Sequence, residues 1–333
     1  MFSFHVRQLE EYSSAYVGCR DFIIERCTTL DDLKDNSLIF VKKRASTDLL
    51  SKLGALRDCL IILLPSEGDT VDLYEKIKAA NLVVETSTPR LEFARVFQFI
   101  LDHSQKKFDE PPVIGQGVRQ GQNVIIGRNT VIGDNTRIDN NVEIGDDVHI
   151  GKNCRIMSGV IINDNVILGE GTVIRENAVI GGWGFGFERD ENGIPVRLPH
   201  VGGVRIGNDV EVGAFSEVVS GTFKPTIVGD HTKIDDFVHV SHNCRVGAAC
   251  LITSYASFSG SVKVGDRCWF GPHAAVIQST TIGNDCFVGM GAVVKKNLPD
   301  GLTVTGNPAR TLEELALERR ISRKLKKDFR DTF

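Results

Sequence analysis

An aliphatic residue returns every six positions through most of this 333-residue chain. The repeat runs without a gap from Ile126 to Ile180, resumes from Ile206 to Val218, and continues from Val228 to Val294. All 25 rungs are apolar, and glycine follows many of them. Neither a helix with 3.6 residues per turn nor a hairpin ladder has a strict period of six. We therefore predict a mainly β chain, a left-handed parallel β-helix of hexapeptide repeats with about eight coils over residues 112–308.

Two interruptions of the repeat predict loops that leave the solenoid. The longer one spans roughly Gly181 to Gly203 and contains Gly182-Trp-Gly-Phe-Gly-Phe187, and a shorter one adds four residues near Thr222 to Pro225. Insertions in a solenoid are extruded as loops, often on the binding face. The glycine-rich run does not sit between a strand and a helix of a βαβ unit, which excludes a dinucleotide site. Its aromatic side chains either contact an acyl chain or a base, or pack on the coil.

Residues 1–105 lack the period and read as a small α/β domain, for which nucleotide binding is a hypothesis. Leu60 to Leu64 reads as a buried strand. Three stretches read as helices: Leu49 to Leu56, Val71 to Ala80 and Pro89 to Leu101. Pro111-Pro112 marks the junction with the solenoid. Residues 311–333 read as a helix, either a solvated cap or oligomer contact, or a docking surface for an acidic partner.

The overall charge and composition narrow the function classes. The net charge of −4 gives no general attraction to nucleic acid or to an anionic membrane. No apolar run approaches the roughly 20 residues that span a bilayer, and the first residues lack the layout of a signal peptide. The eight cysteines include no C-x-x-C pair. We expect reduced, mostly buried thiols and a cytoplasmic protein without a membrane span.

Two histidines lie close together in the repeat and suggest chemistry. Val240 is an inward rung, so His239 points outward from a strand, and His242 falls at a corner. A corner residue has no core pocket, so His242 should be exposed at an edge where a neighbouring subunit can pack. An imidazole there suits a general base, although a lone surface histidine is more often without function. Gly260 lies 18 residues on, one coil above His242, where its N–H could approach a reacting carbonyl.

Metal chemistry has little support in the sequence. Some hexapeptide β-helices are metal-dependent carbonic anhydrases with a His-x4-His pair and a third histidine, and no two histidines here have that spacing. His273, at another corner, is either a substrate contact or a surface residue. We therefore expect no metal site.

Several motifs resemble those of the UDP-3-O-(3-hydroxyacyl)glucosamine N-acyltransferases of lipid A biosynthesis. They are Asn36-Ser-Leu-Ile-Phe40, Pro89-Arg-Leu-Glu-Phe-Ala-Arg95, the Gly-Phe-Gly-Phe loop, Leu198-Pro-His-Val-Gly-Gly-Val-Arg-Ile-Gly207 and Val240-Ser-His-Asn243. The resemblance implies that His242 is the catalytic base and that Gly260 supplies the oxyanion N–H. It also implies that Phe40 stacks on the uridine.

The chain departs from that family at three places. Val219-Ser220-Gly221 stands where the family has Asp-Arg-Gly, so the usual acidic neighbour of the active site is missing. The family's Asn-Pro-Lys-Tyr stretch does not follow Phe40. The ending Val304-Thr-Gly-Asn-Pro-Ala-Arg310 resembles sugar acetyltransferases that use coenzyme A. A relative with another amino sugar or a shorter acyl group is therefore as well supported as the lipid A enzyme.

The sequence hypothesis is an N-acyltransferase. It would move an acyl group from acyl-CoA or acyl carrier protein to the amine of a nucleotide-linked amino sugar, for lipid A or surface-glycan synthesis. It would act as a homotrimer without a tightly bound cofactor. Beyond His242 and Gly260, the expected substrate contacts are His239, Asn243, His273, Phe40, Phe185 and Phe187. The alternatives are a sugar O-acetyltransferase that uses acetyl-CoA and a non-catalytic trimer that binds sugar nucleotides.

Overall fold

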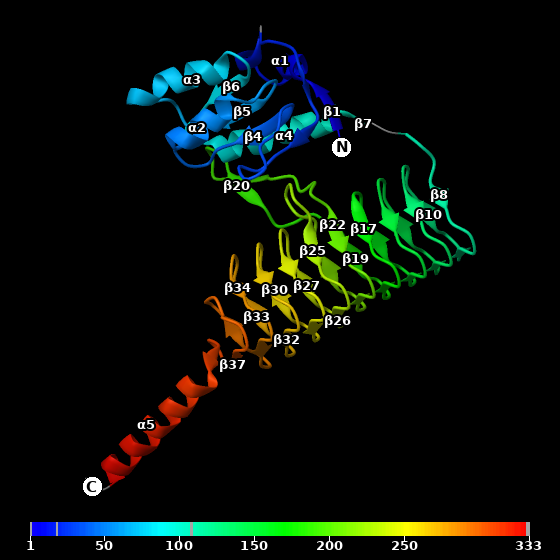
Figure 1. Ribbon diagram of the computed structural model, residues 1–333, viewed down its shortest axis with the longest axis vertical. Helices are drawn as coiled ribbons and strands as arrows, with labels where there is room; N and C mark the ends of the chain where they lie inside the picture. The colour runs from blue at the N-terminus through cyan, green and yellow to red at the C-terminus, as the bar shows by residue number, and fades with distance from the viewer. Residues whose placement is uncertain (1, 18, 107–108, 331–333) are drawn as a thin grey trace. The chain divides into compact units, whose positions relative to one another are not determined.

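The computed structural model describes residues 2–17, 19–106 and 109–330 and divides into two units. One unit comprises residues 1–109 together with 185–200, and the other comprises residues 110–184 and 201–333. Figure 1 shows the short helices of the first unit in blue and cyan and the coils of the second in green to orange. No helix in the described part of the chain is long and apolar enough to cross a membrane.

The first unit is built on a four-stranded parallel sheet in the order β3-β4-β5-β6. These strands are Arg26–Cys27, Ser37–Phe40, Leu60–Leu63 and Leu82–Glu85. The helices are α1 (Leu9–Tyr12), α2 (Thr47–Gly54), α3 (Val71–Lys78) and α4 (Pro89–His103). A small antiparallel sheet joins β1 (Phe2–His5), β2 (Ile23–Ile24) and β7 (Gln105–Lys106). A buried cluster that includes Ile39, Ile61 and Leu53 forms the core.

The insertion after the coil at Ile180 contributes a hairpin to the first unit. Its strands are β20 (Phe187–Arg189) and β21 (Pro195–Arg197). Helix α4 meets this hairpin through ion pairs from Arg90 to Glu188 and from Arg95 to Glu191. Residues almost a hundred positions apart are thereby held together.

The second unit is the left-handed parallel β-helix that the six-residue period predicts. Three sheets, parallel except for the last strand of face 2, run along it, here called faces 1, 2 and 3, and the chain visits them in that order (Figure 1). Paired residues on neighbouring coils are 18 apart outside the insertions and the last coil, as in Val131 and His149. The rung residues fill the interior: Ile132, Ile144, Val240 and Phe258 are among the buried core.

The strands of the three faces are as follows. Face 1 contains β8 (Val113–Ile114), β11 (Val131–Ile132), β14 (His149–Ile150), β17 (Val166–Leu168), β22 (Val204–Ile206), β25 (Thr226–Val228), β28 (Arg245–Val246), β31 (Lys263–Val264) and β34 (Thr281–Ile282). Face 2 contains β9 (Arg119–Gln120), β12 (Arg137–Ile138), β15 (Arg155–Ile156), β18 (Val173–Ile174), β23 (Glu211–Val212), β26 (Lys233–Ile234), β29 (Leu251–Ile252), β32 (Trp269–Phe270), β35 (Phe287–Val288), β37 (Thr303–Thr305) and β38 (Arg310–Thr311). Face 3 contains β10 (Ile125–Ile126), β13 (Glu143–Ile144), β16 (Ile161–Ile162), β19 (Val179–Ile180), β24 (Glu217–Val218), β27 (His239–Val240), β30 (Ser257–Phe258), β33 (Ala275–Val276) and β36 (Val293–Val294).

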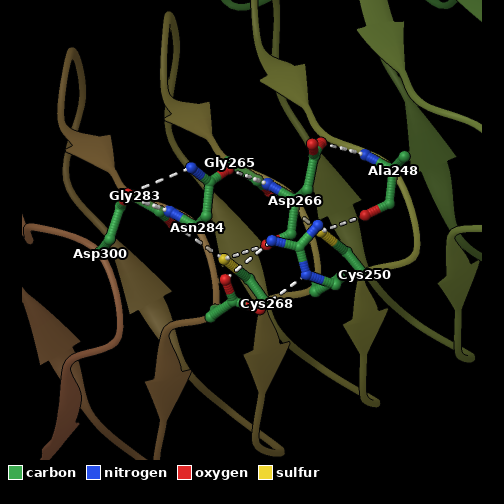
Figure 2. A network of polar contacts seen from close by, with 10 residues as sticks. Ala248, Cys250, Gly265, Asp266, Cys268, Gly283, Asn284 and Asp300 are labelled. Atoms are coloured by element: carbon green, nitrogen blue, oxygen red, sulfur yellow. Dashed lines mark hydrogen bonds and ion pairs between the residues drawn. The ribbon is translucent and has the colours of Figure 1, made fainter.

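The corners between faces are held by short polar side chains that reach from one coil to the next. At the corner between faces 1 and 2, Ala248 N–H donates to Asp266 Oδ1 at 2.8 Å, and Asp266 N–H donates to Asn284 Oδ1 at 2.8 Å (Figure 2). Asn284 N–H continues the row to Asp300 Oδ1 at 2.8 Å. Each bond satisfies a backbone donor that the turn would otherwise leave without a partner.

The solenoid ends in β37, β38 and α5 (Leu312–Arg330). Thr311 and Glu314 begin the helix with a reciprocal cap, since Glu314 N–H donates to Thr311 Oγ1 and Thr311 N–H donates to Glu314 Oε2. The helix therefore starts where the sequence analysis expected one.

Candidate active site

One corner of the solenoid, between faces 3 and 1, carries the histidine and both insertions. The longer insertion connects β19 to β22, and the shorter one connects β24 to β25. The next two coils turn there through residues 241–244 and 259–262, which include His242 and Gly260. The four successive coils therefore place the irregular segments and the predicted base along one edge.

His242 is half-buried at this corner rather than exposed as expected, because Asn243 holds its ring. Asn243 Nδ2 lies 2.9 Å from His242 Nδ1. Thr222 N–H donates to Asn243 Oδ1 at 2.9 Å, and Asn243 Nδ2 also donates to Thr222 Oγ1 at 3.0 Å. A backbone N–H can only donate, so this contact fixes which end of the amide faces the imidazole. The Asn243 amide is thus the donor, and the lone pair of the neutral His242 ring lies on Nδ1.

Gly260 gives the imidazole its space. A β-carbon on residue 260 would lie 2.5 Å from His242 Cε1 and 2.8 Å from Nε2. The φ angle of Gly260 lies outside the left-handed region, so the backbone there does not itself require glycine. The side chain of any other residue would collide with the ring. His242, Asn243 and Gly260, which the sequence singled out, are therefore brought together by the structure.

The N–H of Gly260 lies at a corner without a side-chain acceptor on the next coil, as do the equivalent N–H groups of Asn140, Ser158 and Gln278. At ten corners the equivalent N–H donates to an Asp or Asn side chain on the next coil, as Ala248 does to Asp266. The next coil places Gln278 at that position, and within the described part of the chain no hydrogen bond from Gly260 N–H is found. A half-buried backbone donor beside a histidine can stabilise an oxyanion.

His239 and Glu217 form an ion pair on the outer surface of face 3. His239 Nδ1 lies 3.2 Å from Glu217 Oε2, and the two side chains are 47% and 37% exposed. His239 opens strand β27 and points outward, as the register predicts. Glu217 was not among the predicted site residues, because it is separated from His239 by one coil plus the four inserted residues.

His273 lies at a different corner, between faces 2 and 3, so the structure does not group it with His242. It ends a stack of rings in which Tyr255, Phe237 and Phe215 follow one another at 4.9, 5.0 and 5.2 Å between centroids. All four residues have φ between 58° and 62°. Bulky residues seldom adopt this conformation, which other coils give to Asn or Gly, such as Asn141.

The three predicted phenylalanine contacts belong to the first unit. Phe40 ends β4 and packs on Phe93 with ring centroids 4.6 Å apart. Phe185 and Phe187 lie edge to face at 5.0 Å, and the Arg197 guanidinium sits 4.5 Å from the centre of the Phe187 ring. Phe185 is 88% exposed, so its aromatic surface can meet a ligand.

The chemistry available at the corner is acid–base chemistry. Among the described residues, no group of three His, Cys, Asp or Glu side chains is arranged to hold a metal ion. Cys244 follows Asn243, but burial raises the pKa of its thiol to about 12, and its Sγ–H donates to the Ser259 carbonyl at 3.2 Å. A thiol that remains protonated at neutral pH is a poor nucleophile. The imidazoles and the Gly260 N–H are therefore the groups that can take part in a reaction.

Family profiles match the solenoid. The profile described as bacterial transferase hexapeptide (six repeats) matches residues 147–182 and 261–296. The profile described as hexapeptide repeat of succinyl-transferase matches residues 123–150. The chain therefore contains transferase hexapeptide repeats.

Three curated relatives share one name. A UDP-3-O-acylglucosamine N-acyltransferase from Caulobacter vibrioides is 57% identical over 136 residues, which is 41% of this chain and 40% of that protein. Proteins of the same name from Chlorobium chlorochromatii and Coxiella burnetii are 42% and 46% identical over 82 and 79 residues. These two matches cover 25% and 24% of this chain, and 23% of each relative. The matched stretches thus span less than half the length of these relatives. The resemblance stated from the motifs is confirmed over those stretches.

Two solved structures are similar over the coils. UDP-N-acetylglucosamine acyltransferase from Francisella novicida has a TM-score of 0.44 and 24% identity, covering 63% of this chain and 72% of that one. LpxA from Acinetobacter baumannii has a TM-score of 0.48 and 22% identity, covering 64% and 74%.

Proposed function

We propose that this chain is an acyltransferase that moves an acyl group from a thioester to the amine of a nucleotide-linked amino sugar, in lipid A or surface-glycan synthesis. The observation that carries the proposal is the pairing of His242 with Gly260. It joins a positioned imidazole to a backbone donor that the coil leaves without a partner. The matches to UDP-3-O-acylglucosamine N-acyltransferases support the substrate class.

In the proposed mechanism His242 removes a proton from the attacking amine. The lone pair of the resting ring lies on Nδ1, where the Asn243 amide donates to it. The substrate amine gains positive charge during attack, so its N–H becomes a stronger donor than the neutral Asn243 amide. It can therefore take the place of Asn243 at His242 Nδ1. Asn243 thus holds the ring in place until the substrate arrives.

Gly260 N–H would stabilise the oxyanion that forms when the amine adds to the thioester carbonyl. One such donor contributes about 3 kcal/mol in other acyl-transfer enzymes. The carbonyl then re-forms, the C–S bond breaks, and the sulfur leaves as a thiol with the proton from His242. No metal ion is needed for these steps.

The remaining predicted contacts are proposed to bind substrate. His239, Asn243 and His273 would contact the sugar or the acyl donor, and Phe40, Phe185 and Phe187 would contact the nucleotide or the acyl chain. Replacement of His273, Phe40, Phe185 or Phe187 should raise KM more than it lowers kcat, because these side chains would bind the substrate equally in the ground state and the transition state. We also propose a cyclic homotrimer and acyl-CoA or acyl carrier protein as donor, without a tightly bound cofactor.

The test is acyl transfer by the purified chain. UDP- and dTDP-linked amino sugars would be incubated with short acyl-CoAs or with 3-hydroxyacyl carrier protein, and the products weighed by mass spectrometry. We expect an amide product, stable to mild base. An ester product would favour the sugar O-acetyltransferase alternative, and intact thioester in every reaction would favour a non-catalytic binding protein.

His242→Gln provides the matched variant for that assay. It keeps a polar side chain at the half-buried corner but removes the basic nitrogen, so turnover should fall by about 100-fold or more with an unchanged melting temperature. Retention of more than a tenth of the wild-type rate would exclude His242 as the base.

A further inference from the structure

The substrate amine loses two protons in the proposed reaction, and His242 carries only one of them. A substrate amine that titrates at about 8, as an α-amino group does, reaches the site near pH 7 mainly as ammonium. Its nitrogen then carries three protons, and the amide product keeps one. A second proton travels through His242 to the leaving sulfur. The third must reach solvent before the amine can attack, either before the substrate binds or through another group of the site.

We propose that Glu217 and His239 are that group: the pair takes the first proton from the substrate ammonium and passes it to water. The proposal deepens the function stated above and rests on it. In this proposal His239 is a second base, and Glu217 orients its ring and stabilises the protonated imidazolium. It also provides a carboxylate near the site, although the sequence has Val219 where the family's aspartate stands.

The geometry of the pair suits proton acceptance. A carboxylate can only accept a hydrogen bond, so the contact of 3.2 Å from Glu217 Oε2 places the His239 ring proton on Nδ1. The lone pair of the neutral ring is then on Nε2, and 47% of the side chain is exposed. This arrangement is opposite to that of His242, whose lone pair lies under the Asn243 amide. His239 can therefore accept a proton before any contact inside the protein is broken.

The surroundings of the pair contain no competing charge on its own face. Strands β19 and β30 flank the pair on face 3 and present Val179 and Ser257 outward. From β16 to β36, Glu217 and His239 are the only outward-facing residues of face 3 with ionisable side chains. An ammonium that approaches this part of face 3 therefore meets one carboxylate among the outward-facing residues of the strands.

The longer insertion begins directly against the carboxylate. A β-carbon on Gly182 would lie 2.7 Å from Glu217 Oε1, so the glycine leaves room for this side chain. Trp183 follows and is 55% exposed. The start of the insertion and the Glu217 carboxylate are thus fitted to each other at the corner that holds the proposed site.

The two bases lie three residues apart in the chain. His239 opens β27 and His242 lies two residues beyond the last residue of the strand, Val240. Three residues span at most about 10 Å of extended chain, so one sugar and the two side chains can bridge the Cα atoms. The amine can accordingly lose its first proton at His239 and its second at His242.

The complete step balances as follows. The ammonium gives one proton to His239 Nε2, and Glu217 stabilises the imidazolium. The nitrogen lone pair then forms the C–N bond, the carbonyl electrons move to oxygen beside Gly260 N–H, and His242 takes the second proton. The C–S bond breaks, the sulfur receives the proton from His242, and His239 returns its proton to water. A hydroxyl acceptor would need only His242.

The experiment compares Glu217→Gln and His239→Gln with the wild type from pH 6 to pH 9.5, on an amino-sugar acceptor that the wild type acylates. At pH 7 only about a tenth of the amine is already free. We therefore expect kcat/KM about tenfold lower in both variants at pH 7 and within about twofold of the wild type at pH 9. His242→Gln should be inactive at both pH values. Glu143→Gln, also outward on face 3, is the control and should match the wild type throughout.

Two results would overturn the inference while leaving the proposed function in place. One is a wild-type pH profile in both variants, which would make the pair an ordinary surface ion pair. The other is a loss of equal size at pH 7 and pH 9, which would show a structural role. If the wild type itself transfers no acyl group to any amine, the proposed function fails and this inference fails with it.

Discussion

A β-carbon added to Gly260 would lie 2.5 Å from Cε1 of His242, so the imidazole occupies the space into which any other side chain at residue 260 would project. The two residues are 18 apart and face each other on consecutive coils. Ser261 N–H also donates to the His242 carbonyl at 2.9 Å, which holds the two coils in this register. Residue 260 therefore controls both the position of the ring and the donor beside it.

Gly260→Ala should displace the ring and lower kcat/KM by about 100-fold, since a misplacement of about 1 Å can cost that much. The extra methyl group should also destabilise the corner by about 1–3 kcal/mol. Activity and thermal unfolding would be measured together. Gly54→Ala is the control, because its new methyl group meets Ile77 Cγ1 at an ordinary 3.8 Å. Full activity in Gly260→Ala would show that the ring position is not critical.

The six-residue period was sufficient to predict the solenoid and the pairing of His242 with Gly260. Both follow from one repeating register, since residues 18 apart lie on adjacent coils. The period could not predict the contact of Glu217 with His239, because the four inserted residues change the spacing to 22. It also could not show that Asn243 covers the His242 ring, which depends on Thr222 in the insertion. The conformation of an insertion depends on local packing and hydrogen bonding, which do not follow the six-residue period.

The first unit also contains a contact that the sequence pattern could not predict. Its sheet and helices follow from buried apolar runs and from Pro89 at the start of α4. The contact of α4 with the hairpin does not, because Arg90 and Glu188 are 98 positions apart. The aromatic stack was missed for another reason. Phe215 and Tyr255 occupy left-handed positions where sequence patterns predict Asn or Gly.

Asn243→Asp should reverse the polarity of the contact to His242. The carboxylate can still accept from Thr222 N–H, but toward the ring it accepts a hydrogen bond from Nδ1–H and favours the charged imidazole. Half-maximal activity on the acidic side should therefore move to higher pH. The measurement is a kcat/KM profile from pH 5 to pH 9. Asn243→Gly keeps the left-handed backbone but removes the contact, and it is the control for ring mobility. An unchanged profile in Asn243→Asp would mean that His242 does not titrate in the rate-limiting step.

The contact between the hairpin and α4 should open in acid. The Arg95 guanidinium hydrogen-bonds Glu191 and lowers the pKa of that carboxyl from 4.5 to about 2. A carboxyl whose folded pKa is depressed adds stability above its unfolded pKa, and this is lost as pH falls through the folded value. Between about pH 4.5 and pH 2, the amides of β20 and β21 should lose protection from hydrogen exchange. Glu191→Gln should show the weaker protection already at pH 7. Equal protection in both proteins at pH 7 would show that the ion pair does not hold the hairpin.

Gln278→Asn tests whether Gly260 N–H is kept without a partner for the reaction. At ten other corners an Asp or Asn on the next coil accepts the equivalent N–H, and Asn at residue 278 would restore that bond. The added hydrogen bond should stabilise the fold by about 1 kcal/mol. The same bond occupies the proposed oxyanion donor, so kcat should fall by about 100-fold or more.

The control for this variant is Gln278→Ala, which shortens the same exposed side chain without supplying an acceptor. It should keep the wild-type rate and show no gain in melting temperature. A stabilised and fully active Gln278→Asn would exclude Gly260 N–H as the oxyanion donor. A stabilised and inactive one, beside an active Gln278→Ala, would show that one backbone donor cannot serve both the coil and the reaction. The lack of an acceptor at residue 278 would then lower the stability of the solenoid and, by the same means, leave the Gly260 N–H for the oxyanion.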